Sequence, residues 1–215
     1  MVIDAKVISE IEAKVKRHME DDSTGHDWWH IDRVRRNALT ICRQEHGDAA
    51  RVEMIALLHD VDDWKLKAES QSESLARHWL TAAGVSSEEA GTLCEIIERI
   101  SFKGHGVADE MPFLDGKIVQ DADRLDAIGA IGIARCFAYG GAKGRAIYDP
   151  EDAPELHQSF EDYKTKSGPS INHFHEKLLH LKDRMHTPTA RKMAAERHDF
   201  LEQFLDQFQK EWSGC

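Results

Sequence analysis

The sequence predicts an all-α fold, and three observations support this prediction. Apolar residues recur every three or four positions over most of the chain, no stretch alternates as a β-strand does, and no proline precedes Pro112. Prolines and glycines gather instead in residues 140–169, which indicates a long loop there. At 215 residues the chain can bury one sizeable core. We therefore expect a single-domain helical bundle over residues 1–215, with roughly seven to ten helices of ordinary length.

The first half of the chain contains five stretches with helical apolar spacing. Gly47-Asp48 indicates a helix end followed directly by a new N-cap. Ser86 to Glu89 has the S-x-x-E form of a capping box, in which the two side chains satisfy backbone N–H groups at a helix start. We expect helices over residues 3–15, 31–42, 52–59, 72–83 and 86–100.

The second half of the chain predicts longer helices separated by the loop. Residues 115–139 are rich in Ala and Ile but contain interrupting glycines, so this stretch predicts either one long helix or two segments. After the loop, Ser170 is a helix N-cap, and we expect this helix to continue through Met185. Thr187-Pro188 is an N-cap followed by proline at the first helical position, and it begins a last helix that ends near Trp212.

Composition and charge narrow the classes of partner. The formal net charge of −11, from 28 basic and 39 acidic side chains, disfavours binding to nucleic-acid polymers or to anionic membrane surfaces. No apolar run reaches the length of a transmembrane helix, and no signal-peptide core follows Met1. The four cysteines form no C-x-x-C pair, so we expect reduced thiols and a cytoplasmic location.

A set of His and Asp residues in apolar helical surroundings is the strongest functional signal. Its members are His30, His59, Asp60 and Asp123. Each would be costly to bury alone, but a shared divalent cation would satisfy all of them. Imidazole nitrogen with carboxylate oxygen suits Mn²⁺, Fe²⁺, Zn²⁺ or Mg²⁺, and such an ion can generate a nucleophilic water near neutral pH, which favours a hydrolase. The alternative is that His59 interacts with a helix dipole and Asp60 caps the next turn.

The contexts of these residues resemble the HD superfamily of metal-dependent phosphohydrolases, whose pattern is H…HD…D. His30 lies in His-Ile-Asp-Arg-Val, and His59-Asp60 ends Ala-Leu-Leu-His-Asp. Asp123 lies in Asp-Ala-Asp-Arg-Leu-Asp. Together the matching motifs span about residues 20–135.

Three further segments extend the resemblance toward the C-terminus. The chain is similar to a bacterial subgroup of small stand-alone HD hydrolases at Phe137–Gly141, Ser170–Phe174 and Lys177–Leu179. The resemblance implies an HD-type helical bundle in which C-terminal helices over about residues 170–212 pack on the motif core. It also implies one divalent metal ion, with manganese expected and magnesium, iron, zinc, nickel and cobalt as alternatives.

For this subgroup the resemblance implies hydrolysis of (deoxy)nucleoside triphosphates to monophosphate and pyrophosphate by a metal-activated water. Three alternatives use the same site: a phosphodiesterase or nucleotidase, a guanosine tetraphosphate hydrolase, and a module that senses a nucleotide without hydrolysing it. The expected partner is a small phosphorylated compound, in all cases without a nucleic-acid polymer or a membrane. The apolar faces of the C-terminal helices also permit a homodimer.

The resemblance also implies roles for the residues around the ligands. Asp126, three residues after the implied ligand Asp123 on the same helical face, is an alternative ligand or a neighbour of the ligand. Asp63, four residues after His59, is the implied proton acceptor, and the ligand Asp60 is the second residue with a catalytic role. Asp62, by contrast, is interpreted as a surface acid.

Cationic side chains near the motifs are expected to bind substrate phosphate, although each also fits an ordinary surface charge. His26 and His30 are four residues apart, which resembles the H-E-x-x-H motif of zinc peptidases with Asp in place of Glu. This peptidase alternative leaves His59-Asp60 unexplained. The expected substrate-binding residues are His26, Lys65, Lys103, Arg124 and Arg135.

Overall fold

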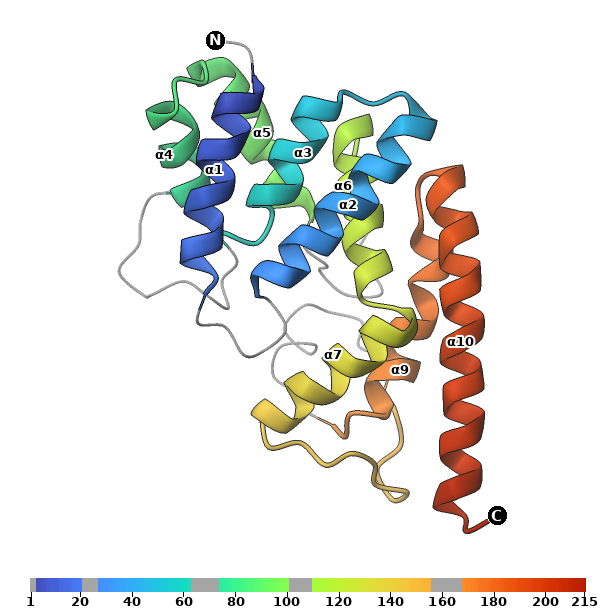
Figure 1. The fold of residues 1–215 in the computed structure, drawn as a ribbon. Coiled ribbons are helices and arrows are strands. Elements are labelled where there is room, and N and C mark those ends of the chain that lie inside the picture. Colours follow the sequence, from blue (N-terminus) through green and yellow to red (C-terminus); the bar gives the residue numbers. More distant parts are fainter. Residues whose placement is uncertain (1–2, 21–26, 63–73, 101–109, 156–167) are drawn as a thin grey trace. The chain divides into compact units, whose positions relative to one another are not determined.

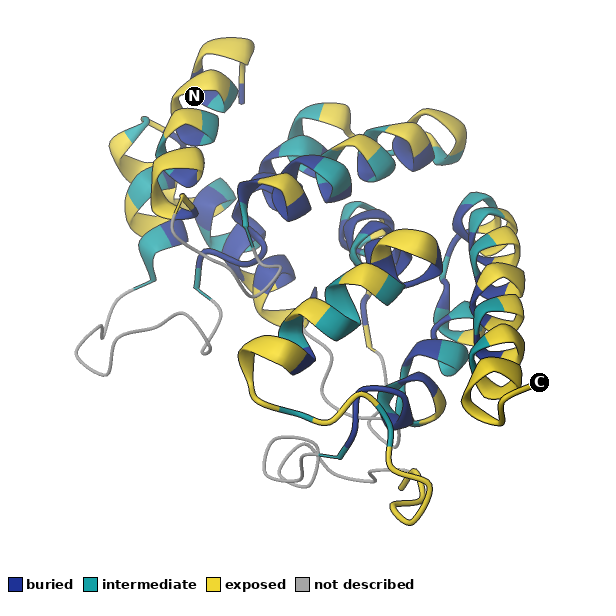
Figure 2. Ribbon diagram, turned by 60° about the horizontal axis from the view of Figure 1, so that its bottom comes forward, coloured by how far each residue is buried: buried dark blue, intermediate teal, exposed yellow. Residues whose placement is uncertain are grey.

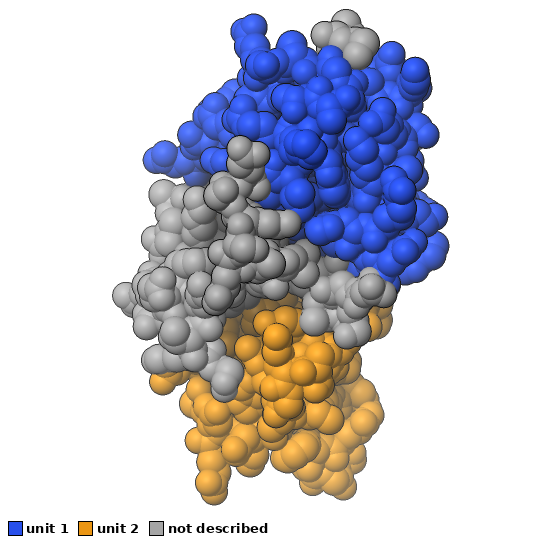
Figure 3. All heavy atoms as spheres, turned by 90° about the vertical axis from the view of Figure 1, so that its left-hand side faces the viewer, with its two compact units in different colours: residues 1–101, 110–122 blue, residues 102–109, 123–215 orange. Residues whose placement is uncertain are grey.

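The structure, a computed structural model, describes residues 3–20, 27–62, 74–100, 110–155 and 168–215 (Figure 1). Within these ranges the regular elements are nine α-helices and two short 3₁₀ helices, with no strand. The predicted all-α fold is confirmed. The described residues form two compact units: unit 1 from residues 1–101 and 110–122, and unit 2 from residue 123 onward (Figure 3). That residues 1–215 act as a single domain stays a prediction.

Unit 1 contains five helices and the first part of a sixth. They are α1 (Ala5–His18), α2 (Trp28–Glu45), α3 (Ala49–Leu58), α4 (Leu75–Ala82), α5 (Ser87–Ile100) and α6 (Leu114–Asp126). α3 is the central helix, because it packs against α1, α2 and α5. Residues 54–58 of α3 are completely buried. The end of this buried run is where the His-Asp pair of the predicted metal site follows.

The junction between α2 and α3 shows how local sequence sets the boundaries in unit 1. Asp48 caps α3 as predicted, since its carboxylate accepts two backbone N–H groups of the first turn at 3.0 and 3.2 Å. The left-handed residue that ends α2 is His46, with φ of 58°, and not the glycine after it. A Cβ on Gly47 would lie 2.6 Å from Cδ1 of Ile118, so the end of that side chain would have to shift.

Unit 2 contains the end of α6, α7 (Gly129–Ala142), α9 (Asn172–Glu176), the 3₁₀ helices η1 (Leu178–His180) and η2 (Lys182–Arg184), and α10 (Pro188–Trp212). α10 packs against α7 and η2, and in Figure 2 it carries exposed residues along one side and buried residues along the other. Thr187 caps α10 as predicted. The stretch 115–139 forms two helices, because Gly129, at the start of α7, takes φ of 71°.

The prediction of one helix over residues 170–185 is wrong. α9 ends at Glu176, and two 3₁₀ helices follow it. The His180 imidazole donates a hydrogen bond to the carbonyl oxygen of His175 at 2.9 Å. A continuing α-helix would use this carbonyl as the acceptor for residue 179. A polar side chain therefore competes with the helical backbone at this point.

Two general properties of the described residues bear on the sequence predictions. None of the helices combines the length with the apolar composition that crossing a membrane requires. All four cysteines are free thiols. Burial raises the pKa of the Cys42 and Cys94 thiols, and it raises the pKa of Cys136 to about 11.

Candidate metal centre

The first turn of α2 and the end of α3 place both histidines of the predicted site. Asp27 caps α2 and accepts the backbone N–H of His30 at 2.9 Å, so His30 lies in the first turn. His59 and Asp60 follow Leu58 at the carboxyl end of α3. Because α2 packs against α3, these side chains form one group. His30, His59 and Asp60 are 0%, 4% and 7% exposed, so the group is shielded from bulk water.

The ring nitrogens and carboxylate oxygens of this group face one another. The Nε2 atoms of His30 and His59 are 3.3 Å apart. Asp60 places Oδ2 3.2 Å from Nε2 of His30 and Oδ1 3.5 Å from Nε2 of His59. Atoms that bind one ion at about 2.1 Å lie roughly 3.0–3.5 Å from each other. The observed spacing therefore fits shared coordination.

A hydrogen bond determines which nitrogen of His59 faces the group. Nδ1 lies 2.8 Å from the carbonyl oxygen of Ala56, and because a carbonyl oxygen can only accept, Nδ1 must donate. In the neutral ring Nε2 then presents its lone pair toward His30 and Asp60. A backbone carbonyl that orients a histidine in this way is a common feature of metal sites and makes the ligand more basic.

Imidazole nitrogens and carboxylate oxygens that converge in a buried space can share a cation. A buried carboxylate beside two imidazole lone pairs is unfavourable unless a proton or a cation joins them. Two nitrogen donors with one carboxylate suit first-row divalent metals. His30, His59 and Asp60 can thus hold a divalent metal ion, in agreement with the predicted cofactor.

Asp123 and Asp126 both lie in the last turn of α6, and their surroundings differ. Asp126 is 1% exposed and forms an ion pair with Arg135, with 3.0 Å between Oδ2 and Nη1. Asp123 is half-buried. The ion pair engages the Asp126 carboxylate within unit 2. The assignment of Asp123 stays a prediction.

Two of the predicted substrate-binding residues lie in the described part of the chain. Arg124 is 5% exposed, and its guanidinium donates to the carbonyl oxygen of Arg184 and lies 3.2 Å from Nε2 of His186. Arg135 forms the ion pair with Asp126. These contacts lie within unit 2, and phosphate binding by either arginine stays a prediction. Outside the described residues lie His26, Asp63, Lys65 and Lys103.

Two polar residues beside the motifs have contacts that the sequence analysis did not anticipate. Asp62, interpreted as a surface acid, accepts three hydrogen bonds from the N-cap and the first two residues of α4. Gln120 is 1% exposed, and its amide donates to the last two carbonyl oxygens of α5 at 3.1 Å each. Asp62 thus bonds to the start of α4, and Gln120 bonds to the end of α5. Such contacts join residues 12 to 21 positions apart, so they leave no periodic signal in the sequence.

Comparisons with known proteins agree with this fold. The HD domain family model matches residues 28–128, from the start of α2 to just beyond α6. In sequence, the chain is 42% identical over 211 residues to the uncharacterized protein YpgQ of Bacillus subtilis. This match covers 97% of the chain and 95% of YpgQ.

Solved structures match nearly the full length of the chain. The crystal structure of Bacillus subtilis YpgQ in complex with ADP gives a TM-score of 0.77 at 38% identity and covers 98% of this chain and 97% of that one. An HD-superfamily hydrolase from Bacillus thuringiensis gives 0.73 at 44% identity and covers 98% of both chains. A protein from Lactobacillus plantarum gives 0.87 at 35% identity and covers 100% of both.

The helical fold, the motif match and these relatives together define the class of protein. The chain belongs to the HD-domain superfamily of metal-dependent phosphohydrolases. The resemblance first seen at His30, His59-Asp60 and Asp123 is confirmed at the level of the family, and the predicted class of enzyme is confirmed with it.

Proposed function

We propose that this protein is a nucleotide pyrophosphohydrolase, which splits a (deoxy)nucleoside triphosphate into the monophosphate and pyrophosphate. The observation that carries the proposal is the convergence of possible ligand atoms from His30, His59 and Asp60, 3.2–3.5 Å apart in a buried group of an HD domain. The ADP in the YpgQ complex supports a nucleotide as the ligand. ADP contains the base, the ribose and a phosphoanhydride, all of which a nucleoside triphosphate also contains.

In the proposed site, His30, His59 and Asp60 hold one divalent ion, and manganese is the proposed native metal. Asp123 is the proposed fourth ligand on the strength of its motif. When bound, the ion supplies a nucleophilic water near neutral pH and offsets negative charge on phosphate oxygens. The Ala56 carbonyl keeps His59 in the tautomer that ligation requires.

The proposed reaction is a displacement at the α-phosphorus of the nucleotide. The oxygen of water forms a bond to this phosphorus, the bond from phosphorus to the α–β bridging oxygen breaks, and pyrophosphate leaves with the bonding electrons. We propose that Asp63 accepts the proton of the attacking water. Asp60, three residues earlier in the chain, is the second residue with a proposed catalytic role. The side chains proposed to contact phosphate are His26, Lys65, Lys103, Arg124 and Arg135.

Chromatography of the products tests the reaction. Protein loaded with Mn²⁺ is incubated with nucleoside mono-, di- and triphosphates, cyclic nucleotides and guanosine tetraphosphate. We expect triphosphates to yield monophosphate and pyrophosphate in equal amounts. Release of orthophosphate would replace the proposal with a nucleotidase, and turnover confined to cyclic nucleotides or guanosine tetraphosphate would replace it with those activities. Metal-loaded protein that hydrolyses none of these compounds would indicate a nucleotide sensor.

Hydrolysis in ¹⁸O-labelled water locates the attacked phosphorus. Attack at the α-phosphorus places the label in the monophosphate, whereas attack at the β-phosphorus places it in the pyrophosphate. Mass spectrometry of the two products distinguishes these outcomes. We expect the label in the monophosphate, and a labelled pyrophosphate would contradict the proposed displacement.

A further inference from the structure

We propose that Asp62 is a positioning residue for the metal centre, because its carboxylate holds the turn that carries His59 and Asp60 against the start of α4. This inference rests on the metal site proposed above and adds a residue that no motif marks. Asp62 lies two residues after Asp60 in the chain. It acts through Asp60 and not by contact with the substrate or the ion.

The Asp62 carboxylate accepts three hydrogen bonds from the start of α4. Oδ2 accepts the hydroxyl of Ser74 at 2.6 Å and the backbone N–H of Ala76 at 3.1 Å. Oδ1 accepts the backbone N–H of Leu75 at 3.0 Å. Because both oxygens are engaged, the carboxylate cannot turn without losing at least one of these bonds.

These bonds satisfy donors that a helix start otherwise leaves without partners. The first N–H groups of an α-helix have no acceptor within the helix. In α4, Leu75 and Ala76 donate to Asp62, while Arg77 donates to the hydroxyl of Ser74 at 3.2 Å. The negative charge of Asp62 also lies at the positive end of the helix dipole. Asp62 and Ser74 therefore form a shared cap that joins the turn to α4.

The other side of the turn is held by α3. The N–H of Val61 donates to the carbonyl oxygen of Leu58 at 3.2 Å, and Val61 is 2% exposed. His59 donates through Nδ1 to Ala56 within the same helix end. Asp60 lies between these inner contacts and the outer contact made by Asp62. The position of its carboxylate therefore depends on both sides of the turn.

Metal affinity is sensitive to such support. Groups that orient a ligand from outside the coordination shell typically change affinity 10–100-fold when they are removed. Without Asp62 the far side of the turn loses its bonds to α4, and the Asp60 carboxylate gains freedom to leave the position 3.2 Å from His30 Nε2. We expect weaker metal binding as the direct result.

The experiment compares Asp62→Ala with Asp4→Ala as a matched control. Asp4 caps α1 in the same manner, since its carboxylate accepts the N–H groups of Lys6 and Val7 at 3.0 and 2.9 Å. Both variants lose a carboxylate cap, and we expect both to lower the melting temperature of the metal-free protein by a few degrees. Titration with Mn²⁺, followed by the electron paramagnetic resonance of the free ion, gives the Kd of each variant.

The two variants should differ in their Kd for Mn²⁺. We expect Asp62→Ala to raise the Kd for Mn²⁺ about tenfold, and Asp4→Ala to leave it within about twofold of the wild-type value. Asp62→Asn and Ser74→Ala provide graded changes. The first keeps one acceptor oxygen but turns an amide N–H₂ toward a donor, and the second removes one of the three bonds. We expect their Kd values to lie between those of the wild type and Asp62→Ala, with Asp62→Asn the weaker binder.

Several results would overturn the inference. Wild-type affinity in Asp62→Ala would do so, as would an equal loss in Asp4→Ala, because the effect would then be general destabilisation. If Asp62→Ala does not fold, wild-type affinity in both Asp62→Asn and Ser74→Ala decides against it. A wild-type protein that binds no Mn²⁺ would remove the proposed metal site and this inference together. The titration needs no turnover, so a failure of the proposed nucleotide activity alone leaves the result readable.

Discussion

The candidate metal centre in unit 1 and the aromatic core of unit 2 both include residues of segments that resemble family motifs, but different kinds of atoms meet in them. In unit 1, the Nε2 atoms of His30 and His59 and the carboxylate oxygens of Asp60 face one another at 3.2–3.5 Å. Such an arrangement is favourable only with a proton or a cation present. The motif residues of unit 1 therefore form a group that could hold a metal ion.

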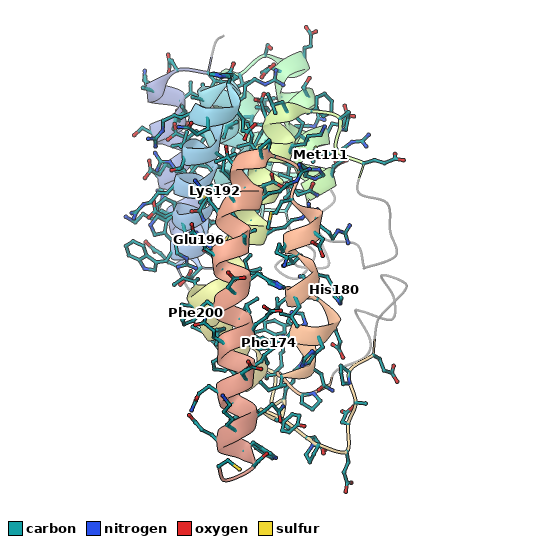
Figure 4. All side chains as sticks on the ribbon, turned by 90° about the vertical axis from the view of Figure 1, so that its right-hand side faces the viewer. Met111, Phe174, His180, Lys192, Glu196 and Phe200 are labelled. Carbon is teal, nitrogen blue, oxygen red and sulfur yellow. The ribbon has the colours of Figure 1, made fainter. Side chains whose placement is uncertain are left out.

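In unit 2, by contrast, aromatic rings contact one another, and these contacts are favourable without a bound ion. The aromatic cluster consists of Phe137 of α7, Phe174 of α9 and Phe204 of α10. Phe174 is completely buried, and its ring stacks on that of Phe204 with the centroids 5.6 Å apart. Phe137 lies 6.0 Å from both rings. Figure 4 shows Phe174 beside α10. Aromatic pairs at these distances are favourable in themselves.

The glycine of the same motif region serves the packing of unit 2. A Cβ on Gly140 would lie 2.1 Å from Oγ of Ser170, so any larger residue there would require Ser170 to shift. Cys136, one residue before the first segment, donates through Sγ to the carbonyl oxygen of Ser170 at 3.4 Å. The segments Phe137–Gly141 and Ser170–Phe174 thus contact each other. We interpret these segments as packing elements of unit 2, whereas we interpret the HD motif through the chemistry of its side chains.

The largest expected effect is the loss of function in His59→Ala. Because His59 is a proposed ligand, bound Mn²⁺ should fall from about one ion per chain to near none, and turnover should fall more than about a hundredfold. Metal analysis and the product assay measure the two quantities. His78→Ala, on the exposed side of α4, is the control and should match the wild type. If His59→Ala keeps its metal, the group of His30, His59 and Asp60 would be a polar cluster and not the metal site.

Phe174→Ala tests the opposite property in unit 2. Truncation of a completely buried phenylalanine leaves a cavity and should lower the free energy of unfolding by about 3–5 kcal/mol. The Kd for Mn²⁺ of the folded variant should not change. Phe200→Ala is the matched control, since Phe200 is 45% exposed on the same helix α10 and should cost no more than about 0.5 kcal/mol. Denaturant unfolding gives both values, and equal losses would contradict the packing interpretation.

Gly140→Ala should have a smaller effect on stability, about 1–3 kcal/mol from overpacking. Ser170 is 3% exposed, so its hydroxyl has little room to move away from a new methyl group. In the double variant with Ser170→Ala the close atom is absent, and the Ser170 Cβ would lie at an ordinary 3.4 Å. We expect the double variant to lose less free energy of unfolding than the two single variants lose together. Additive losses in a denaturant-based double-mutant cycle would argue against this close contact.

The same comparison explains which parts of the structure the sequence could predict. Helix starts at Asp48 and Thr187 were predictable because a cap is formed by residues two or three positions apart. The break after Glu176 was not, since the hydrogen bond from the His180 side chain to His175 competes with a backbone bond that apolar spacing favours. Short-range patterns thus predicted elements well where no side chain competed with the backbone.

The candidate site was less predictable from local patterns than the helix starts were. Periodicity does not show that His30 and His59 meet, and this part came from the resemblance to HD proteins. The role of Asp62 was missed for a physical reason: its partners begin 12 positions later, at Ser74, across a stretch that gives no local signal. Long-range polar contacts of this kind, like that of Gln120, require the arrangement of helices in space.

The smallest expected effect concerns the Cys136 thiol in unit 2. Burial raises its pKa from 9.0 to about 11, so at pH 8 the thiolate fraction is about a hundredfold smaller than for an unshifted thiol. An aromatic disulfide reagent should therefore label the exposed Cys215 well before Cys136. Labelling of Cys136 should increase as the pH rises toward 11, and the unfolded chain would lose this proton earlier, so stability should fall over the interval from pH 9 to 11.

Mass spectrometry of labelled peptides measures this order, and Gly140→Ala sharpens it. Because a methyl group at position 140 would displace Ser170, the hydrogen bond from the Cys136 Sγ to the Ser170 carbonyl should weaken, and Cys136 should react faster at a given pH. The proposed metal ligands of unit 1 should be unaffected, so the Kd for Mn²⁺ serves as the control. Equal labelling rates for Cys136 and Cys215 at pH 8 in the wild type would show that the cluster of unit 2 does not exclude water. The contrast between the aromatic cluster of unit 2, explained by packing, and the group in unit 1, proposed to bind a cation, would then no longer hold.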